Sequence, residues 1–376
     1  MWKNKKIGAL VLAAGYSSRM GDFKSLLPFG GVTVIERVIH TFRQAGIMDI
    51  RVVVGYRADE LIAVLDGLKV PYVFNENYDA GMFSSVVKGI QSFQPEIEAF
   101  FLLPGDMPLV KSHTVRLLSR AFDKVEADVV YPAFQKQRGH PPLIGARCFS
   151  EIVLGNGKGG LRQILAQHEG KAYDVEVLDE GILLDLDTRE DYQKMSSEYY
   201  RRDIPTKAEC DAILLRMNVP DPIVNHGRVV ADVSRKLANS LNQAGLSIDV
   251  DIVIVAAKLH DLAKGQPDHA RMGARMLKKC GYYKVAQIVA AHTDSKSEDE
   301  LPDEAAVVYL ADKLVKGDCI VSINERFSGA LDKYTGNTEA VAAIIERYQR
   351  AQKMEKAVEQ LLGVSLGKII TDPCYA

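Results

Sequence analysis

The hydrophobic pattern changes character once along the chain, and this change predicts the domain organisation. From residue 7 to about 195, short β-branched runs alternate with amphipathic helical stretches, whereas beyond residue 208 nearly every apolar run has helical spacing. The sequence has 376 residues, more than the ~250–300 that a single hydrophobic core usually serves. We therefore predict four parts: an α/β domain over residues 1–198, a polar linker over 199–206, an all-α domain over 207–335 and a C-terminal helical extension over 336–376.

The first domain contains five strand-like runs, IGALVLAAG, IRVVVGY, VPYVFNE, AFFLLPGD and ADVVYPAF, with helical stretches between them. Such alternation predicts an α/β fold with a mainly parallel sheet. Ligands bind to sheets of this kind at the carboxyl ends of the strands. The glycine-containing loop after the first run and Asp106, which ends the fourth, both lie at such ends, so we expect them to share a site.

Charge and cysteine usage exclude several classes of protein. The net charge is −2, which gives no reason to expect a nucleic-acid or membrane-surface partner. The five cysteines are scattered without a Cys-x-x-Cys spacing, which fits a reducing compartment rather than a disulfide framework. The short apolar run IGALVLAAG is better explained as a buried strand than as a signal peptide. We expect a cytoplasmic protein.

The loop LAAGYSSRMGDFKSLLPFGG has the composition of a phosphate-binding segment. Ala13, Ala14 and Gly15 are small enough for backbone N–H groups to approach phosphates, and Arg19 and Lys24 supply positive charge. Neither the Walker A pattern nor the G-x-G-x-x-G fingerprint is present in this loop. The loop therefore predicts a triphosphate site of another kind.

This loop resembles the signature L-A-[AG]-G-x-S-x-R-M-G-x-x-K of the nucleotidyltransferases that attach a nucleotide to the molybdenum cofactor (MobA-like, with a nucleotide-diphospho-sugar transferase fold). NENYDAGMFSSVVKGI, FLLPGDMPLV, RGHPPLIGARCF and LLDLDTREDY follow in the family's order. The resemblance implies that Arg19 and Lys24 are catalytic and grip the triphosphate, and that Asp106 binds Mg²⁺ together with Asp187, which we prefer to Asp185. The nucleotide-binding residues that it implies are Leu12, Ala13, Ala14, Gly15, Ser17, Arg19, Lys24, Gly81, Ser84 and Ser85.

The Ala-Ala-Gly form of the loop resembles the cytidylyl-transferring branch, so CTP is favoured over GTP, with a phosphorylated acceptor such as molybdopterin. Three features depart from the family pattern: Met107 replaces an expected Gln, Phe83 interrupts the serine run, and GNGKGGLR (155–162) is rich in glycine. These departures could change the acceptor. GNGKGG could form a second phosphate loop or a plain flexible turn.

The all-α half contains six potential metal ligands in a characteristic order. His260 and Asp261 are adjacent, so on a helix they diverge by ~100° and can converge on one ion only near a helix end or when they flank one corner of a cluster. Mixed imidazole and carboxylate ligands suit Fe, Mn, Zn or Ni better than Ca²⁺. The predicted ligands are His226, His260, Asp261, His269, His292 and Asp312.

The H…HD…H…H…D order is similar to that of the HD superfamily of phosphohydrolases, and LHDLAKGQPDHARMGARML resembles the small bacterial members that cleave dinucleoside polyphosphates. The resemblance implies one or two transition-metal ions, with Asp261 bridging and catalytic, and a substrate phosphate contacted by Lys264. Together the two halves predict a bifunctional enzyme with a nucleotide-like hydrolase substrate.

Three alternatives remain from the sequence. The HD part could sense a nucleotide without hydrolysing it, or the transferase could serve a sugar or lipid precursor beside a housekeeping hydrolase. The helical half could also be a metal-free bundle used for dimerisation. The segment EAVAAIIERYQRAQKMEKAVEQLLG could pack on the helical domain or form a homo-oligomer contact.

Overall fold

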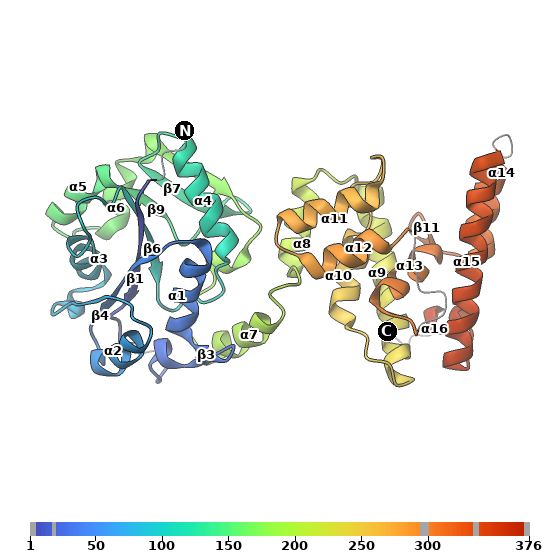
Figure 1. Ribbon diagram of the computed structural model, residues 1–376, viewed down its shortest axis with the longest axis horizontal. Coiled ribbons are helices and arrows are strands. Elements are labelled where there is room, and N and C mark those ends of the chain that lie inside the picture. The colour runs from blue at the N-terminus through green and yellow to red at the C-terminus, as the bar shows by residue number, and fades with distance from the viewer. Residues whose placement is uncertain (1–4, 17–19, 294–300, 334–337, 372–376) are drawn as a thin grey trace. The chain divides into compact units, whose positions relative to one another are not determined.

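The computed structural model describes residues 5–16, 20–293, 301–333 and 338–371. The chain divides into two compact units, residues 1–202 and 203–376; the colours of Figure 1 run from blue to green through the first and from yellow-green to red through the second. Strands and helices alternate in unit 1, and unit 2 is almost wholly helical. The predicted fold class of both halves is confirmed.

The main sheet of unit 1 has the strand order β10-β7-β9-β6-β1-β4-β5, with β8 paired to β7. β1 lies between β4 and β6 and is parallel to both, whereas β9 is antiparallel to its neighbours β6 and β7. The carboxyl ends of β1, β4, β5 and β6 therefore meet at one edge of the sheet. The strands are β1 (Ile7–Ala13), β4 (Asp49–Val54), β5 (Tyr72–Phe74), β6 (Ala99–Pro104), β7 (Val129–Phe134), β8 (Gln137–Arg138), β9 (Leu143–Gly145) and β10 (Ala172–Glu176). A small hairpin adds β2 (Pro28–Phe29) and β3 (Val32–Thr33).

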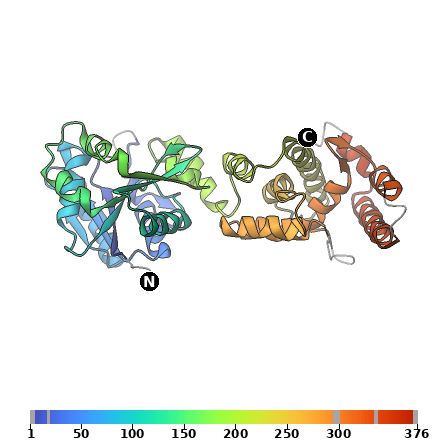
Figure 2. The same cartoon turned by 90° about the horizontal axis from the view of Figure 1, so that it is seen from above.

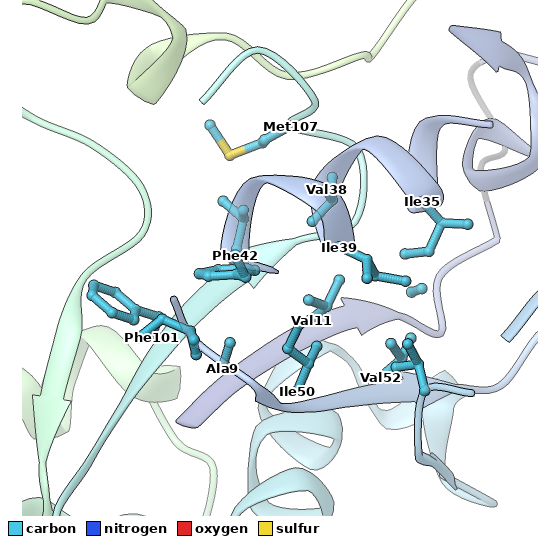
Figure 3. Close-up of a cluster of buried hydrophobic side chains, with 14 of the residues drawn as sticks. Ala9, Val11, Ile35, Val38, Ile39, Phe42, Ile50, Val52, Phe101 and Met107 are labelled. Atoms are coloured by element: carbon cyan, nitrogen blue, oxygen red, sulfur yellow. The ribbon is translucent and has the colours of Figure 1, made fainter. Parts of the chain in front are cut away.

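Side chains that alternate along the strands form two hydrophobic cores, one on each face of the sheet. Ala9 and Val11 of β1 join Ile39 of α1 in the larger core, and Leu10 joins Val86 of α3 in the other. Figure 3 shows α1 lying over β1 and β4, with Ile35, Val38, Ile39 and Phe42 directed at Val11, Ile50 and Val52, and the turned view shows helices beside the sheet (Figure 2). The helices of unit 1 are α1 (Val34–Ala45), α2 (Ala58–Gly67), α3 (Met82–Gln91), α4 (Ser112–Lys124), α5 (Phe149–Leu154), α6 (Gly160–Ala166) and α7 (Arg189–Tyr200).

Helix α7 extends into the segment predicted as a linker. Thr188 and Asp191 form a capping box at its start, which fixes where the helix begins. Near its end, Tyr199 packs on Phe29, at 5.2 Å between ring centroids, and the Arg37 guanidinium lies 4.4 Å from the Tyr199 ring. These contacts pack Tyr199, in the last turn of α7, on unit 1, whereas Tyr200 is 76% exposed.

Unit 2 is built around α9, whose apolar stripe is buried. His226, Val230, Val233, Leu237 and Leu241 recur at helical spacing and are all buried, which is the pattern of a central helix packed on one face. α9 packs against α10 and α13, and α11 packs against α12. The elements are α8 (Lys207–Arg216), α9 (Asp221–Gln243), α10 (Val250–Leu259), α11 (His269–Lys279), α12 (Tyr283–Ala291), α13 (Glu304–Lys313), β11 (Val315–Lys316), β12 (Cys319–Ile320), α14 (Ile323–Lys333), α15 (Thr338–Leu362) and α16 (Leu366–Thr371).

The predicted C-terminal extension belongs to unit 2. α15 packs against α13 and α14, and it runs beside α14 in both views (Figures 1 and 2). Ala351 and Val358 of α15 are buried, and the Lys236 ammonium of α9 donates to the Ile370 carbonyl of α16 at 2.6 Å. Among the described residues, no helix combines the length and apolarity needed to cross a membrane.

A buried ion-pair cluster in unit 1 makes its stability pH-dependent. The His168 ring contacts Asp128 at 2.9 Å and Glu151 at 3.0 Å, and hydrogen bonding to Asp128 raises the pKa of His168. Burial opposes ionisation of Asp128, but the bonds from His168 and Arg147 still lower its pKa. The histidine contribution is complete below its unfolded pKa of 6.5 and is lost as pH rises through the raised value. The aspartate contribution is present above 3.8, so the cluster stabilises most between about pH 4 and 6.5.

We predict that His168→Gln lowers the free energy of unfolding by about 1–3 kcal/mol at pH 5.5. At pH 8.5 the loss should be smaller, because the wild-type ring has then lost its charge. Urea denaturation of the variant and the wild-type protein at the two pH values measures both. Equal losses at both pH values would show that the charge on His168 contributes nothing.

Candidate active site and candidate metal centre

A cavity of about 670 Å³ opens at the carboxyl ends of β1 and β6. Leu12, Ala13, Ala14 and Gly15 line it, as do Gly81, Ser85, Asp106 and Asp187. The structure therefore brings most of the predicted nucleotide-binding residues to one place. Ser17 and Arg19 lie outside the described residues. Ser84 is not among the lining residues, and its hydroxyl donates to the carbonyls of Asn77 and Gly81 at 2.8 Å each.

Lys24 connects the two predicted magnesium ligands. Its ammonium lies 2.8 Å from Asp187 Oδ1 and 3.5 Å from Asp106 Oδ2. The Lys24 side chain is only 9% exposed, because it leaves the short helix η1 (Lys24–Leu26) pointing into the sheet edge. The Leu186 backbone N–H donates to the Asp106 carbonyl at 3.0 Å, which fixes the Asp187 segment beside Asp106. Asp185 also lines the cavity but is exposed.

The two carboxylates fit a hard divalent cation. Both face one positive charge, that of Lys24, and Mg²⁺ prefers one or two carboxylates together with phosphate oxygens. Burial raises the pKa of Asp106, and the charge of Asp185 adds to this while Lys24 opposes it. Gly105 lets the end of β6 approach β1, since a Cβ there would lie 3.1 Å from the Leu12 carbonyl oxygen. A side chain at position 105 would therefore crowd the end of β1 next to Asp106.

Several lining residues were not predicted from the sequence. Tyr16 and Tyr78 line one part of the cavity, and Arg138 and His140 line another. Arg138 is held by Glu169 and Asp174 at 2.7 Å each. Each was present in a quoted motif, but a motif does not indicate which of its side chains faces a cavity.

The structure shows where the three departures from the family pattern lie. Met107 is 4% exposed and lines the cavity, so an apolar side chain stands beside the carboxylate site. Residues 155–162 are not among the lining residues. Gly157, Gly159 and Gly160 have positive φ, and Phe83 lies close to Gly155 and Gly157. This geometry favours a turn over a second phosphate loop.

The six predicted ligands of unit 2 converge in a buried cage. They come from α9 (His226), the end of α10 (His260 and Asp261), the start of α11 (His269), the end of α12 (His292) and the end of α13 (Asp312). α10 ends at Leu259 and His260 is its C-cap. Two adjacent residues can therefore face one centre because the helix ends there.

Asp261 is common to two possible metal-ligand groups. One consists of His226, His260 and Asp261, and the other of Asp261, His269 and His292. Asp261 Oδ2 lies 3.4 Å from His260 Nε2, and Asp261 Oδ1 lies 3.2 Å from His269 Nε2 and 3.7 Å from His292 Nε2. Asp312 Oδ1 joins the first group, 3.1 Å from His226 Nε2 and 3.5 Å from His260 Nε2. Oδ2 of Asp261 thus belongs to the first group and Oδ1 to the second.

The imidazoles are oriented as metal-binding histidines are. Nδ1 lies 2.7 Å from a backbone carbonyl oxygen in each of three rings: that of Gly317 for His226, Ala257 for His260 and Val289 for His292. With Nδ1 as the donor to the backbone, Nε2 is the ring nitrogen that faces the cage and would bind a metal ion when unprotonated. Within the described part of the chain, His260 Nε2 and Asp261 Oδ1 are buried without a hydrogen bond. Buried polar atoms of this kind are expected where an ion binds.

The charge of the cage favours cations. Burial opposes ionisation of Asp261, but the surrounding imidazoles keep its pKa well below the usual range. Burial also opposes ionisation of Asp312, and Lys313 and the imidazoles lower its pKa strongly. Burial would lower the pKa of His260, yet the two carboxylates outweigh it and raise the pKa to about 9. Burial lowers the pKa of His292. The carboxylates are therefore ionised at neutral pH.

Two lysines flank the cage in different ways. The Lys264 ammonium lies 2.7 Å from Asp261 Oδ2, and its side chain is 44% exposed. The Lys313 ammonium lies 2.6 Å from Asp312 Oδ2, and its side chain is only 11% exposed. Lys313 was not predicted from the sequence. Since it binds the Asp312 oxygen that faces away from the imidazoles, it positions Asp312, whereas Lys264 is accessible to a substrate.

Unit 1 thus has a cavity with two carboxylates and a buried lysine at the carboxyl ends of its strands, and unit 2 carries a histidine–aspartate cage. Two family models match the chain, a MobA-like NTP transferase domain over residues 9–172 and an HD domain over residues 223–317. The chain therefore combines a MobA-like nucleotidyltransferase domain with an HD domain.

Known relatives match part of the chain. The molybdenum cofactor cytidylyltransferase of Escherichia coli K12 is 29% identical over 194 residues, covering 51% of this chain and 97% of that protein. A probable molybdenum cofactor guanylyltransferase of Bacillus cytotoxicus is 27% identical over 144 residues, 38% of this chain and 68% of that protein. The crystal structure of Rv0371c from Mycobacterium tuberculosis H37Rv has 27% identity and a TM-score of 0.45, covering 52% of this chain and 100% of that one.

The shared carboxylate yields a prediction about metal content. His292→Gln removes a ligand from one group only, so we expect about half the metal of the wild-type protein. Asp261→Asn changes both groups and should remove nearly all of it. Elemental analysis of protein purified without chelator measures this, with His168→Gln of unit 1 as a histidine control. Equal metal loss in the two cage variants would mean that the groups do not bind separate ions.

Proposed function

We propose that the chain is a bifunctional enzyme, with nucleotidyl transfer in unit 1 and phosphoester or phosphoanhydride hydrolysis in unit 2. For the transferase, the supporting observation is the convergence of Lys24, Asp106 and Asp187 at a cavity lined by the Ala-Ala-Gly loop. For the hydrolase, it is the pair of ligand groups that share Asp261.

In the proposed transfer, a phosphate oxygen of the acceptor attacks the α-phosphorus of the NTP. The new P–O bond forms as the bond from the α-phosphorus to the bridging oxygen breaks, and pyrophosphate leaves. Lys24 neutralises charge on the triphosphate, and Asp106 and Asp187 would hold Mg²⁺. The bound ion would supply further neutralisation of the departing pyrophosphate. CTP is our preferred nucleotide, from the Ala13-Ala14-Gly15 sequence, and a molybdopterin-like phosphate monoester is our preferred acceptor. The cytidylyltransferase of Escherichia coli supports both choices.

In the proposed hydrolysis, the four histidines with Asp261 and Asp312 would hold one or two transition-metal ions. Such ions would activate a water and stabilise the oxygens of an in-line displacement at phosphorus. Asp261 holds the two groups in register, and Lys264, being exposed, contacts a substrate phosphate. A water oxygen bonds to phosphorus while the ester or anhydride oxygen leaves with a proton. A nucleotide-type substrate with a phosphoanhydride is the proposed class.

Reciprocal variants test the proposal in the full chain. Asp106→Asn should lower cytidylyl transfer by about a hundredfold or more, because a carboxylate that would hold the charge-neutralising Mg²⁺ is lost, and leave hydrolysis unchanged. Asp261→Asn should do the reverse. Label transfer from [α-³²P]CTP to molybdopterin and phosphate release from a dinucleoside polyphosphate panel measure the two activities. Asp66→Asn is the matched carboxylate control, because Asp66 is exposed on α2 and is not among the residues that line the cavity.

Each outcome decides a specific point. Loss of both activities in either variant would show that the two sites are coupled. Wild-type transfer without any phosphate release would leave unit 2 as a nucleotide sensor, the alternative that the sequence also allowed. Transfer to a sugar phosphate in place of molybdopterin would redirect the acceptor without changing the proposed chemistry of unit 1.

A further inference from the structure

Three tyrosines from three different loops meet at one side of the nucleotide cavity. Tyr16 follows β1, Tyr56 follows β4 and Tyr78 lies beyond β5. The Tyr16 ring centroid is 5.2 Å from that of Tyr56 and 5.4 Å from that of Tyr78, and the latter pair is edge-to-face. Tyr16 and Tyr78 line the cavity, whereas Tyr56 is not among the lining residues.

The loops that carry the tyrosines are held together by the backbone. The Tyr56 N–H donates to the Ala14 carbonyl at 3.2 Å. At Gly55, a Cβ would lie 2.7 Å from Tyr78 Cβ and 2.9 Å from Ala14 Cβ, so a side chain there would separate the loops. The close packing of these loops therefore positions the tyrosine cluster in the cavity wall. Even so, Tyr16 remains 50% exposed and Tyr56 37% exposed, an unusual exposure for rings that contact one another.

Strand order places this cluster on the opposite side of β1 from the charged residues. β4 and β5 lie on one side of β1, and β6 lies on the other. Asp106 follows β6, and the backbone of residue 186 bonds to it, so both carboxylates lie on the β6 side. Between the two sides lie the small residues Ala13, Ala14 and Gly15. The cavity therefore has one side with the Asp106 and Asp187 carboxylates and another with the tyrosine rings, where Asp79 also lines it, and the small residues lie between the two.

An NTP has the same two-part character, with an anionic triphosphate and a flat base. We propose that Tyr16, supported by Tyr56 and Tyr78, forms the face on which the nucleobase of the bound NTP stacks. This inference rests on the proposed transferase function. It assigns the base to the β4–β5 side and leaves the wall formed by residues 137–140 and Ile182, which lies beyond β6, to the acceptor.

Stacking on an aromatic ring is tolerant of base identity, because every base has a π-face. Tyr16 therefore contributes affinity for the base and does not select CTP over GTP. Selection of CTP over GTP must come from groups that contact the edges of the base. The backbone of residues 13–15, which precedes Tyr16, is the nearest candidate in sequence. The proposal thus separates affinity for the base from choice of the base.

Binding to the full chain tests the proposal without turnover. The probes are α,β-methylene CTP, α,β-methylene GTP and inorganic tripolyphosphate, which has the phosphates and no base, all titrated calorimetrically with Mg²⁺. Tyr16→Ala should raise the Kd of both nucleotide analogues about tenfold or more and leave that of tripolyphosphate within about twofold. Tyr16→Phe should retain wild-type affinity. Tyr56→Ala should give a smaller loss, because it acts only through the Tyr16 ring.

Tyr173→Ala is the matched control, since Tyr173 is 45% exposed on β10 and is not among the lining residues. Equal weakening of tripolyphosphate and nucleotides by Tyr16→Ala would overturn the proposal, because Tyr16 would then act through the phosphate loop. Unchanged nucleotide affinity with weakened acceptor binding would also overturn it and assign the rings to the acceptor. If the wild-type protein binds none of the three probes, the transferase function itself fails.

Discussion

Burial of the Asp261 carboxylate is the constraint on which unit 2 is built. A carboxylate that is 4% exposed is strongly unfavourable unless cations or donors surround it. Four imidazoles and the Lys264 ammonium lie within 3.9 Å of its two oxygens. Those side chains come from α9, α10, α11 and α12, or from the turns at their ends. The ends of α10 and α12 and the start of α11 must therefore lie near the His226 position of α9.

Unit 1 also buries a charged side chain, but there the buried charge is positive. Lys24 is the buried charge there, and two carboxylates compensate it. Because those carboxylates come from the end of β6 and the segment after η5 (Glu180–Leu183), the two ion pairs of Lys24 tie the segment after β1 to the sheet. In the proposed transferase function, an incoming triphosphate would compete with the carboxylates for Lys24, and the carboxylates would then be available to a cation.

Sequence reasoning is most specific where a residue type has few chemical roles. The six His/Asp residues predicted as ligands lie close together and Asp106 lines the cavity; their roles as ligands stay predictions. Sequence reasoning missed features set by tertiary packing. The three-residue strand β9 runs antiparallel because pairing with β6 and β7, rather than local propensity, decides its direction. Tyr16 and Tyr56 are 40 residues apart, so only strand order brings their rings together. The burial of Lys313 against Asp312 could not be predicted from its position beside Asp312 in the sequence.

The exposure of the cationic groups differs between the two candidate sites. The Lys24 side chain is 9% exposed among the residues that line the cavity, so in the proposed transferase function the phosphates of a nucleotide must enter the cavity to reach it. Lys264 is 44% exposed beside the cage, so in the proposed hydrolase function a phosphate can reach it from solvent. The two proposed reactions therefore place different demands on their lysines, since one lysine is held by carboxylates inside a cavity and the other is partly exposed.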